Sequence, residues 1–153
     1  MKRILLVSLA LALAGCYRYT PPGPPTPRPA VSVAAPFART WDAVIDHFAE
    51  RNISIATIER ASGIVVASPL QLRGGWEYLR TLADCGSSTS DGTYLPTRVS
   101  FNVRVRDNGA ESLMRVNANF ESVTSSVNIF PCTTKGVLES ELEATIREAA
   151  EKR

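Results

Sequence analysis

Residues 98–121, RVSFNVRVRDNGAESLMRVNANFE, decide the fold. Apolar and polar side chains alternate on both sides of Asp107-Asn108-Gly109-Ala110, a run that favours a tight turn between antiparallel strands. The arginines and asparagines point to the side opposite the apolar set. That apolar set consists of Val99, Phe101, Val103, Val105, Met114, Val116, Ala118 and Phe120. The stretch therefore predicts a β-hairpin with one core face and one face toward water.

Two amphipathic helices flank this hairpin in the sequence. In residues 37–50 the apolar side chains recur at the spacing of one helical face, and residues 136–151 carry a similar stripe. Shorter strands are expected at 30–34, 53–58 and 64–68, and a long connection at 70–97. The order is β-α-β-β, a long loop, then β-β-α. We expect an α+β fold in which a single antiparallel sheet carries two helices packed on one face.

The amino-terminal residues are typical of a secretory signal. Lys2 and Arg3 precede an apolar run over residues 4–14, which is too short to span a bilayer. The sequence LAGC at residues 13–16 resembles the lipobox of bacterial lipoproteins, in which the cysteine receives a diacylglyceryl group and the signal is cut just before it. The resemblance implies that residues 1–15 are removed and that Cys16 is lipidated. The alternative is an ordinary secreted protein cut near Gly15, which would leave Cys16 as an unpaired thiol.

Lipid attachment would fix the mature protein to a membrane, because two or more acyl chains anchor a protein stably. Tyr17, rather than an aspartate, follows Cys16. By resemblance to the enterobacterial sorting pattern, this favours the outer membrane, on its periplasmic side. Loss of Lys2 and Arg3 leaves fifteen basic and fifteen acidic residues. This neutral balance gives no indication of a nucleic-acid partner.

A proline-rich run separates the predicted lipid from the predicted domain. Six of the nine residues at 21–29 are proline, which favours extended polyproline II over a packed core. We interpret residues 16–30 as a stalk that holds the α+β domain, residues 31–153, about 30 to 40 Å from the lipid. A proline-rich ligand for a partner protein is the alternative.

Two further cysteines, Cys85 and Cys132, are predicted to form a disulfide, because such bonds persist outside the cytoplasm. They would close a loop of about 48 residues, for which the chain-entropy estimate is about 4 kcal/mol. A metal site is the alternative, but two cysteines and the distant His47 supply too few ligands at no recognisable spacing.

The stretch over residues 31–68 resembles a known family. A short strand, the Trp41 helix and a hairpin that turns at Ser62-Gly63 are similar to the domains of BamC-type lipoproteins of the outer-membrane β-barrel assembly machinery. The segments around Cys85 and Cys132 look more like small, uncharacterised envelope lipoproteins. The resemblance implies a helix-grip fold and an outer-membrane location. A fold and a location do not determine a function.

The polar face of the hairpin and the long connection supply the candidate binding residues. They are Arg98, Arg104, Arg106 and Arg115 on the hairpin, with Trp76 and Tyr78 in the connection. The arginine patch is suited to an acidic protein, an anionic saccharide or a lipid headgroup. The aromatic pair is suited to anchoring a partner. The alternatives are a solvated sheet face whose charges oppose aggregation, and aromatic side chains that fold under to cover the sheet.

No catalytic set is evident. We expect His47 on the surface of the first helix, and no serine lies in a nucleophile elbow. The glutamates of the last helix are interpreted as its solvated face, and they are Glu139, Glu141, Glu143, Glu148 and Glu151. We therefore expect no enzyme, no metal and no cofactor.

The leading hypothesis is a non-enzymatic accessory or scaffold lipoprotein that binds another envelope protein. A carrier of a small apolar ligand, held between the Trp41 helix and the sheet, is the alternative. A hydrolase of envelope polymers that uses His47 is a third class. The space between that helix and the sheet separates the first two, because a filled core argues against a carrier.

Overall fold

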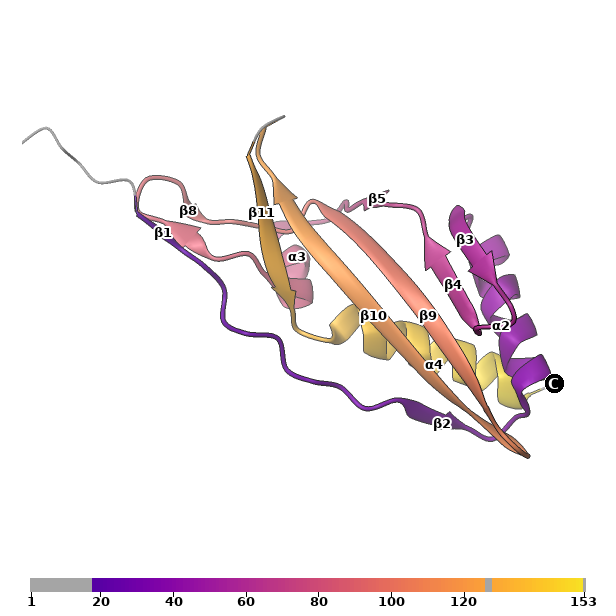
Figure 1. The fold of residues 1–153 in the computed structure, drawn as a ribbon. Coiled ribbons are helices and arrows are strands. Elements are labelled where there is room, and N and C mark those ends of the chain that lie inside the picture. The colour runs from indigo at the N-terminus through magenta and orange to yellow at the C-terminus, as the bar shows by residue number, and fades with distance from the viewer. Residues whose placement is uncertain (1–17, 126–127, 153) are drawn as a thin grey trace, which may run out of the picture.

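The computed structural model describes residues 18–125 and 128–152, so the predicted signal and Cys16 lie outside the described residues. Within these ranges the chain forms an α+β fold with an eight-stranded sheet, a three-stranded sheet and three helices (Figure 1). The expected single sheet with two helices is therefore wrong. Residues 70–97 and residues 19–20 account for the difference, because they contain the helix α3 and several two-residue strands that are too short to show an alternating pattern.

The predicted hairpin is confirmed as the centre of the larger sheet. Strands β9 (Arg98–Asn108) and β10 (Glu111–Val123) pair without interruption, from Arg98 opposite Glu121 to Asn108 opposite Glu111. The turn includes Gly109, which has a φ of 77° that a side chain would disfavour. All eight residues of the predicted apolar set are buried.

Shorter strands share the outer edges of this hairpin. On the β9 side lie β5 (Leu70–Gln71) and β4 (Ile64–Ala67), and β3 (Ile55–Glu59) pairs with β4. On the β10 side, β2 (Val31–Val33) pairs near the turn and β11 (Ile129–Thr134) pairs at the far end, followed by β6 (Ala83–Asp84). The pairing with β2 ends at Met114 and that with β11 begins at Phe120. Residues 115–119 of β10 therefore have no strand partner on this edge within the described chain.

The two long helices, α2 (Phe37–Glu50) and α4 (Val137–Glu151), contact each other and pack behind β9 and β10 (Figure 1). Both match the predicted helical segments closely. The Phe48 ring lies 5.5 Å from the Phe101 ring between helix and sheet, and Ile146 is fully buried on the other helix. Because the helices cover one face only, the other face of the hairpin is left open.

The second sheet lies at the end of the molecule that also holds the tip of the β10–β11 hairpin (Figure 1). It contains β1 (Tyr19–Thr20), β7 (Ser87–Ser88) and β8 (Gly92–Thr93). The short helix α3 (Trp76–Leu82) packs against β6 and α4. The predicted disulfide is confirmed: Cys85, which follows β6, is bonded to Cys132 of β11.

The proline-rich segment does not project from the domain as a stalk. After β1 it runs alongside the open edge of β10 as far as β2 (Figure 1). The Thr133 hydroxyl donates to the carbonyl oxygen of Gly23 at 2.6 Å, and the Arg115 guanidinium donates to the carbonyl oxygen of Arg28. The segment therefore runs along the domain instead of projecting from it.

Candidate functional site

Three of the predicted binding residues come together on the open face of the hairpin. Arg104 of β9 lies directly opposite Arg115 of β10, and Arg106 lies opposite Leu113. Together with Ala30 they line a small pocket of about 130 Å³. Arg104 and Arg106 are exposed, while Arg115 is partly buried. We call Arg104, Arg106 and Arg115 the arginine cluster.

No carboxylate among the described residues forms an ion pair with the arginine cluster. Among the described residues, the ion pairs involve Arg28, Arg60, Arg98 and Lys152, and none of these belongs to the cluster. The Arg115 Nε is buried without a hydrogen-bond partner in that part of the chain. Like charges placed directly opposite each other across two strands destabilise a sheet. The cluster is therefore a local surplus of positive charge that a bound anion would relieve.

The fourth predicted arginine does not belong to this cluster. Arg98 lies opposite Glu121, and the two side chains form an ion pair at 2.5 Å. Its charge is therefore neutralised within the sheet.

The predicted aromatic pair lies elsewhere, on α3, which packs on the helix side of the molecule through β6 and α4. Trp76 is 56% exposed and Tyr78 is 47% exposed, so neither folds under to cover the sheet. The Arg80 guanidinium lies 5.1 Å from the centre of the Trp76 ring. These aromatics remain available on the surface, but they do not contribute to the arginine cluster.

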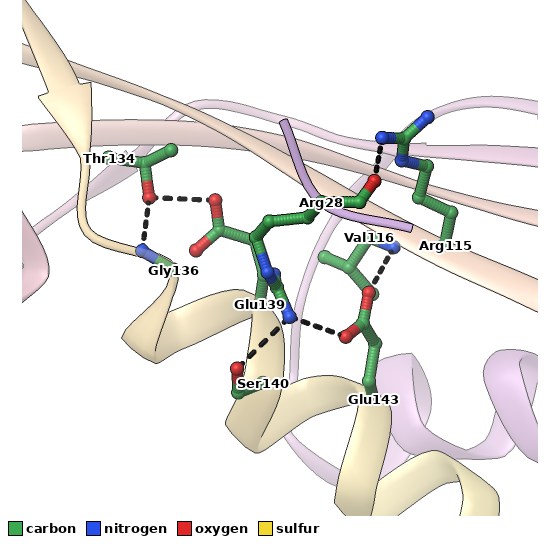
Figure 2. A network of polar contacts seen from close by, with 8 residues as sticks. All are labelled: Arg28, Arg115, Val116, Thr134, Gly136, Glu139, Ser140 and Glu143. Atoms are coloured by element: carbon green, nitrogen blue, oxygen red, sulfur yellow. Dashed lines mark hydrogen bonds and ion pairs between the residues drawn. The ribbon is translucent and has the colours of Figure 1, made fainter. Parts of the chain in front are cut away.

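Arg28 fastens the proline-rich segment to α4 (Figure 2). One guanidinium nitrogen donates to Glu143 Oε2 at 2.7 Å and to Ser140 Oγ at 3.0 Å. We call this arrangement of Arg28, Ser140 and Glu143 the Arg28 clasp. Because Arg115 donates to the carbonyl oxygen of Arg28, the clasp and the arginine cluster share one contact. The path of the proline-rich segment and the position of Arg115 are thereby linked.

Two glutamates of α4, Glu143 in the clasp and Glu139 one turn before it, are buried, although we expected the glutamates of this helix to be solvated. Glu139 is 1% exposed and Glu143 is 4% exposed. Glu143 Oε1 accepts the backbone N–H of Val116 at 2.9 Å, at the edge of β10 that lacks a strand partner. Glu139 Oε1 accepts the Thr134 hydroxyl at 2.7 Å. These contacts compensate part of the cost of burying carboxylates, so the expectation was wrong for this pair.

A signal for this burial is present in the sequence. Glu139 and Glu143 are four residues apart, and they fall on the same helical stripe as Leu142 and Ile146. Carboxylates within an apolar stripe require a cationic or hydrogen-bonding partner. Arg28, the only charged residue between Arg18 and Arg39, is that partner for Glu143, and the Thr134 hydroxyl is the partner of Glu139.

Gly136, at the start of α4, lies close to the Arg28 side chain of the clasp. Its φ is 78°, and a Cβ added there would lie 3.2 Å from the Arg28 side chain. Its backbone N–H donates to the Thr134 hydroxyl at 3.0 Å. A glycine is required here both by the backbone conformation and by the approach of Arg28.

His47 is buried, with 7% of its surface exposed, so the expectation of a surface histidine was wrong. It lines a pocket of about 340 Å³ between α2 and α4, together with Arg51, Glu141 and Thr145. Burial lowers the pKa of His47 and the nearby Arg51 charge lowers it further, while Glu50 acts in the opposite direction. The imidazole is therefore mainly neutral at pH 7.

The space between the Trp41 helix and the sheet is occupied by packed side chains. Trp41 is 3% exposed and stacks on Phe37 at 5.9 Å between ring centres. Phe48 is 1% exposed and contacts Phe101. This packing favours a binding surface on the outside of the molecule over a ligand carried inside it.

Within the described ranges, no helix is both long and apolar enough to cross a bilayer. In comparisons with known proteins, no protein-family model and no curated protein sequence matches the chain. The resemblance to BamC-type domains therefore stays a prediction, and the function is argued from the site alone.

Proposed function

We propose that this protein is a lipid-anchored protein of the bacterial envelope that binds an acidic surface of another envelope protein through the arginine cluster. Lipid on Cys16 would fix it to a membrane, for which the sequence favours the outer membrane on its periplasmic side. The role is that of a non-enzymatic accessory or scaffold protein.

The observation that carries the proposal is the unneutralised charge of the arginine cluster. Arg104 and Arg115 stand opposite each other on the open face, and no described carboxylate forms an ion pair with either. The chain as a whole, with 17 basic and 15 acidic residues, is nearly balanced in charge, so the surplus is a local feature of this face. This positive charge would raise both the affinity and the association rate for an acidic partner. Arginine is also suited to carboxylates because its guanidinium can form two parallel hydrogen bonds.

Charge reversal on the open face tests the proposed interaction. Arg104→Glu combined with Arg106→Glu is expected to abolish crosslinking to the partner in intact cells of the native host. Arg147→Glu is the matched control, because Arg147 is an exposed arginine on α4, behind the opposite face of the sheet. Crosslinking of the unaltered protein in isolated membranes is expected to fall as salt is raised, since exposed charges are screened. Equal crosslinking of the same species by the double variant and by the control would refute this role of the cluster.

The lipid anchor needs a separate test. The intact mass of the protein from host membranes is expected to match a chain that begins at an acylated Cys16, with two thiols appearing only after reduction. Cys16→Ser is expected to leave the protein in the soluble fraction. An unlipidated mass for the unaltered protein would refute the anchor without bearing on the arginine cluster.

A further inference from the structure

We infer that the three-stranded sheet rests directly on the surface of the bilayer, so that the domain is seated on lipid instead of being held away from it. This inference rests on the lipid anchor of the proposed function. Its partner is a lipid surface, and the contacting face is the end of the molecule built around β1, β7 and β8.

The first described residues are paired firmly with the domain. Tyr19 lies opposite Ser88 in the sheet formed by β1 and β7. Just before this pairing, the backbone N–H of Thr89 donates to the carbonyl oxygen of Arg18 at 3.2 Å, and the Arg18 N–H donates to the Thr89 hydroxyl at 3.3 Å. The chain is therefore fixed to the domain from residue 18 onward.

The Tyr19 side chain strengthens this attachment. Its hydroxyl donates to the carbonyl oxygen of Cys85 at 3.1 Å, next to the disulfide. Its ring lies 5.0 Å from that of Phe130 and 6.1 Å from that of Tyr94, and these two rings stack on each other at 4.5 Å. At Gly86, an added Cβ would lie 2.3 Å from the carbonyl oxygen of Thr20, so the close approach of β1 depends on the absence of a side chain there. An aromatic cluster next to a covalent crosslink thus holds β1 in place.

The length of the chain sets how far the lipid can be from this sheet. Cys16 is two residues before Arg18, and an extended chain spans at most about 3.6 Å per residue. The Cα atom of a lipidated Cys16 would therefore lie within about 7 Å of that of Arg18. A free proline-rich stalk would allow about 30 to 40 Å. Because the acyl chains must enter the bilayer, the interface must lie against the second sheet.

The surface at this end suits contact with headgroups. Residues 89–93, which form the turn between β7 and β8 with its edges, are exposed and consist of small polar side chains, Asp91 and a glycine. Ile129, at the nearby start of β11, is 47% exposed and adds an apolar contact. The β9–β10 turn lies at the other end of the hairpin, since β11 pairs with the far end of β10 and β10 (Glu111–Val123) is about 40 Å long. The molecule therefore has one end near lipid and one end far from it.

Depth-dependent quenching tests this orientation in the lipidated full-length protein, reconstituted into vesicles of phosphatidylethanolamine and phosphatidylglycerol. A fluorophore is attached to Ser90→Cys or, as the matched control at the far end, to Ala110→Cys. Both positions are exposed. The added cysteine is the reactive thiol, because Cys85 and Cys132 are bonded to each other and Cys16 is acylated. Nitroxide on the lipid headgroups is expected to remove most of the emission at residue 90 and little at residue 110.

A variant that frees the proline-rich segment tests whether the contacts of Tyr19 and Arg28 hold the domain against the membrane. Tyr19→Ala combined with Arg28→Ala removes the side chains that hold both ends of the proline-rich segment. In this background the quenching at residue 90 is expected to fall to the level at residue 110, with circular dichroism and the disulfide unchanged. Unchanged quenching would overturn the inference that these contacts hold the domain on the membrane.

The two proposals fail in different ways. Protein that does not float with the vesicles, or that carries no acyl mass, overturns both the lipid anchor and the seating. Protein that floats but is quenched equally weakly at residues 90 and 110 overturns the seating alone. Equal and strong quenching at both residues would also overturn it, because it would place the long axis of the hairpin flat on the membrane.

Discussion

Removal of the Arg28 side chain should loosen the proline-rich segment and destabilise the domain. Glu143 is 4% exposed, and its Oε2 is paired with a guanidinium whose side chain is 24% exposed. Loss of one member of a fully buried pair costs about 3 to 5 kcal/mol, because an uncompensated charge stays in the interior. Water can reach this pair from the Arg28 side, and Glu143 keeps the hydrogen bond from the Val116 N–H. We therefore expect Arg28→Ala to cost about 2 to 3 kcal/mol.

Thermal denaturation of the detergent-solubilised protein, followed by circular dichroism, measures this cost. For a domain of this size the expected loss corresponds to a fall in Tm of about 6 to 12 °C. Glu143→Gln is expected to cost less stability than Arg28→Ala. The glutamine amide oxygen can still accept the Val116 N–H, and no uncompensated carboxylate charge is left in the interior. In the double variant the two effects should be less than additive, since each single change removes the same ion pair.

Arg147→Ala is the matched control, because Arg147 is an exposed arginine of the same helix. It is expected to leave the Tm almost unchanged. A fall of less than about 1 °C for Arg28→Ala would refute the reasoning, since it would mean that the clasp contributes almost nothing to stability.

Three further predictions concern other parts of the molecule. Gly136→Ala should cost about 1 to 2 kcal/mol of stability in urea denaturation, because its φ of 78° disfavours a side chain and Arg28 lies close to it. Gly75→Ala is the control and should cost little, because Gly75 has an ordinary φ of −67° and open space around it. Equal losses of stability for the two variants would contradict the explanation. Burial lowers the pKa of His47 below 6.5, so the unfolded chain binds more protons, and stability should fall as the pH drops from 6.5 through the lowered folded-state pKa. His47→Gln should remove that part of the pH dependence, and an unchanged profile would exclude His47 as its source. Reduction of the Cys85–Cys132 bond should cost about 4 kcal/mol less any relief of strain, measured as the loss of Tm in reductant, whereas a Tm that does not fall would show that the crosslink adds no stability.

The central hairpin could be predicted because its alternation is long and regular. The two long helices could be predicted for the same reason, since each carries a stripe of several turns. The second sheet could not, because strands of two residues, such as β1 and β7, carry no periodic signal. Their positions depend on contacts distant in sequence, such as those between Tyr19 and Phe130. Local patterns do not contain that information.

The candidate site could be predicted in part. Arg104, Arg106 and Arg115 could be grouped because residues two apart on a strand share a face and the turn sets the register. The pairing of Arg98 with Glu121 also follows from the same register. Arg28 could not be placed, because nothing in a proline-rich run indicates which surface it will follow. The glutamates in the apolar stripe of α4 indicate that a cationic or hydrogen-bonding partner is needed, and for Glu143 that partner is Arg28.

The path of the proline-rich segment has a consequence for the solubility of the protein. Residues 115–119 of β10 would otherwise present an unpaired backbone edge, and such edges recruit strands from other molecules and lead to aggregation. Pro25 and Pro27 lie over this edge, and a proline has no N–H with which to extend a sheet. The segment therefore caps the sheet without continuing it. A molecule that has lost these residues to proteolysis should polymerise more readily than the intact protein, so the amino-terminal segment protects the domain from the unpaired edge of β10.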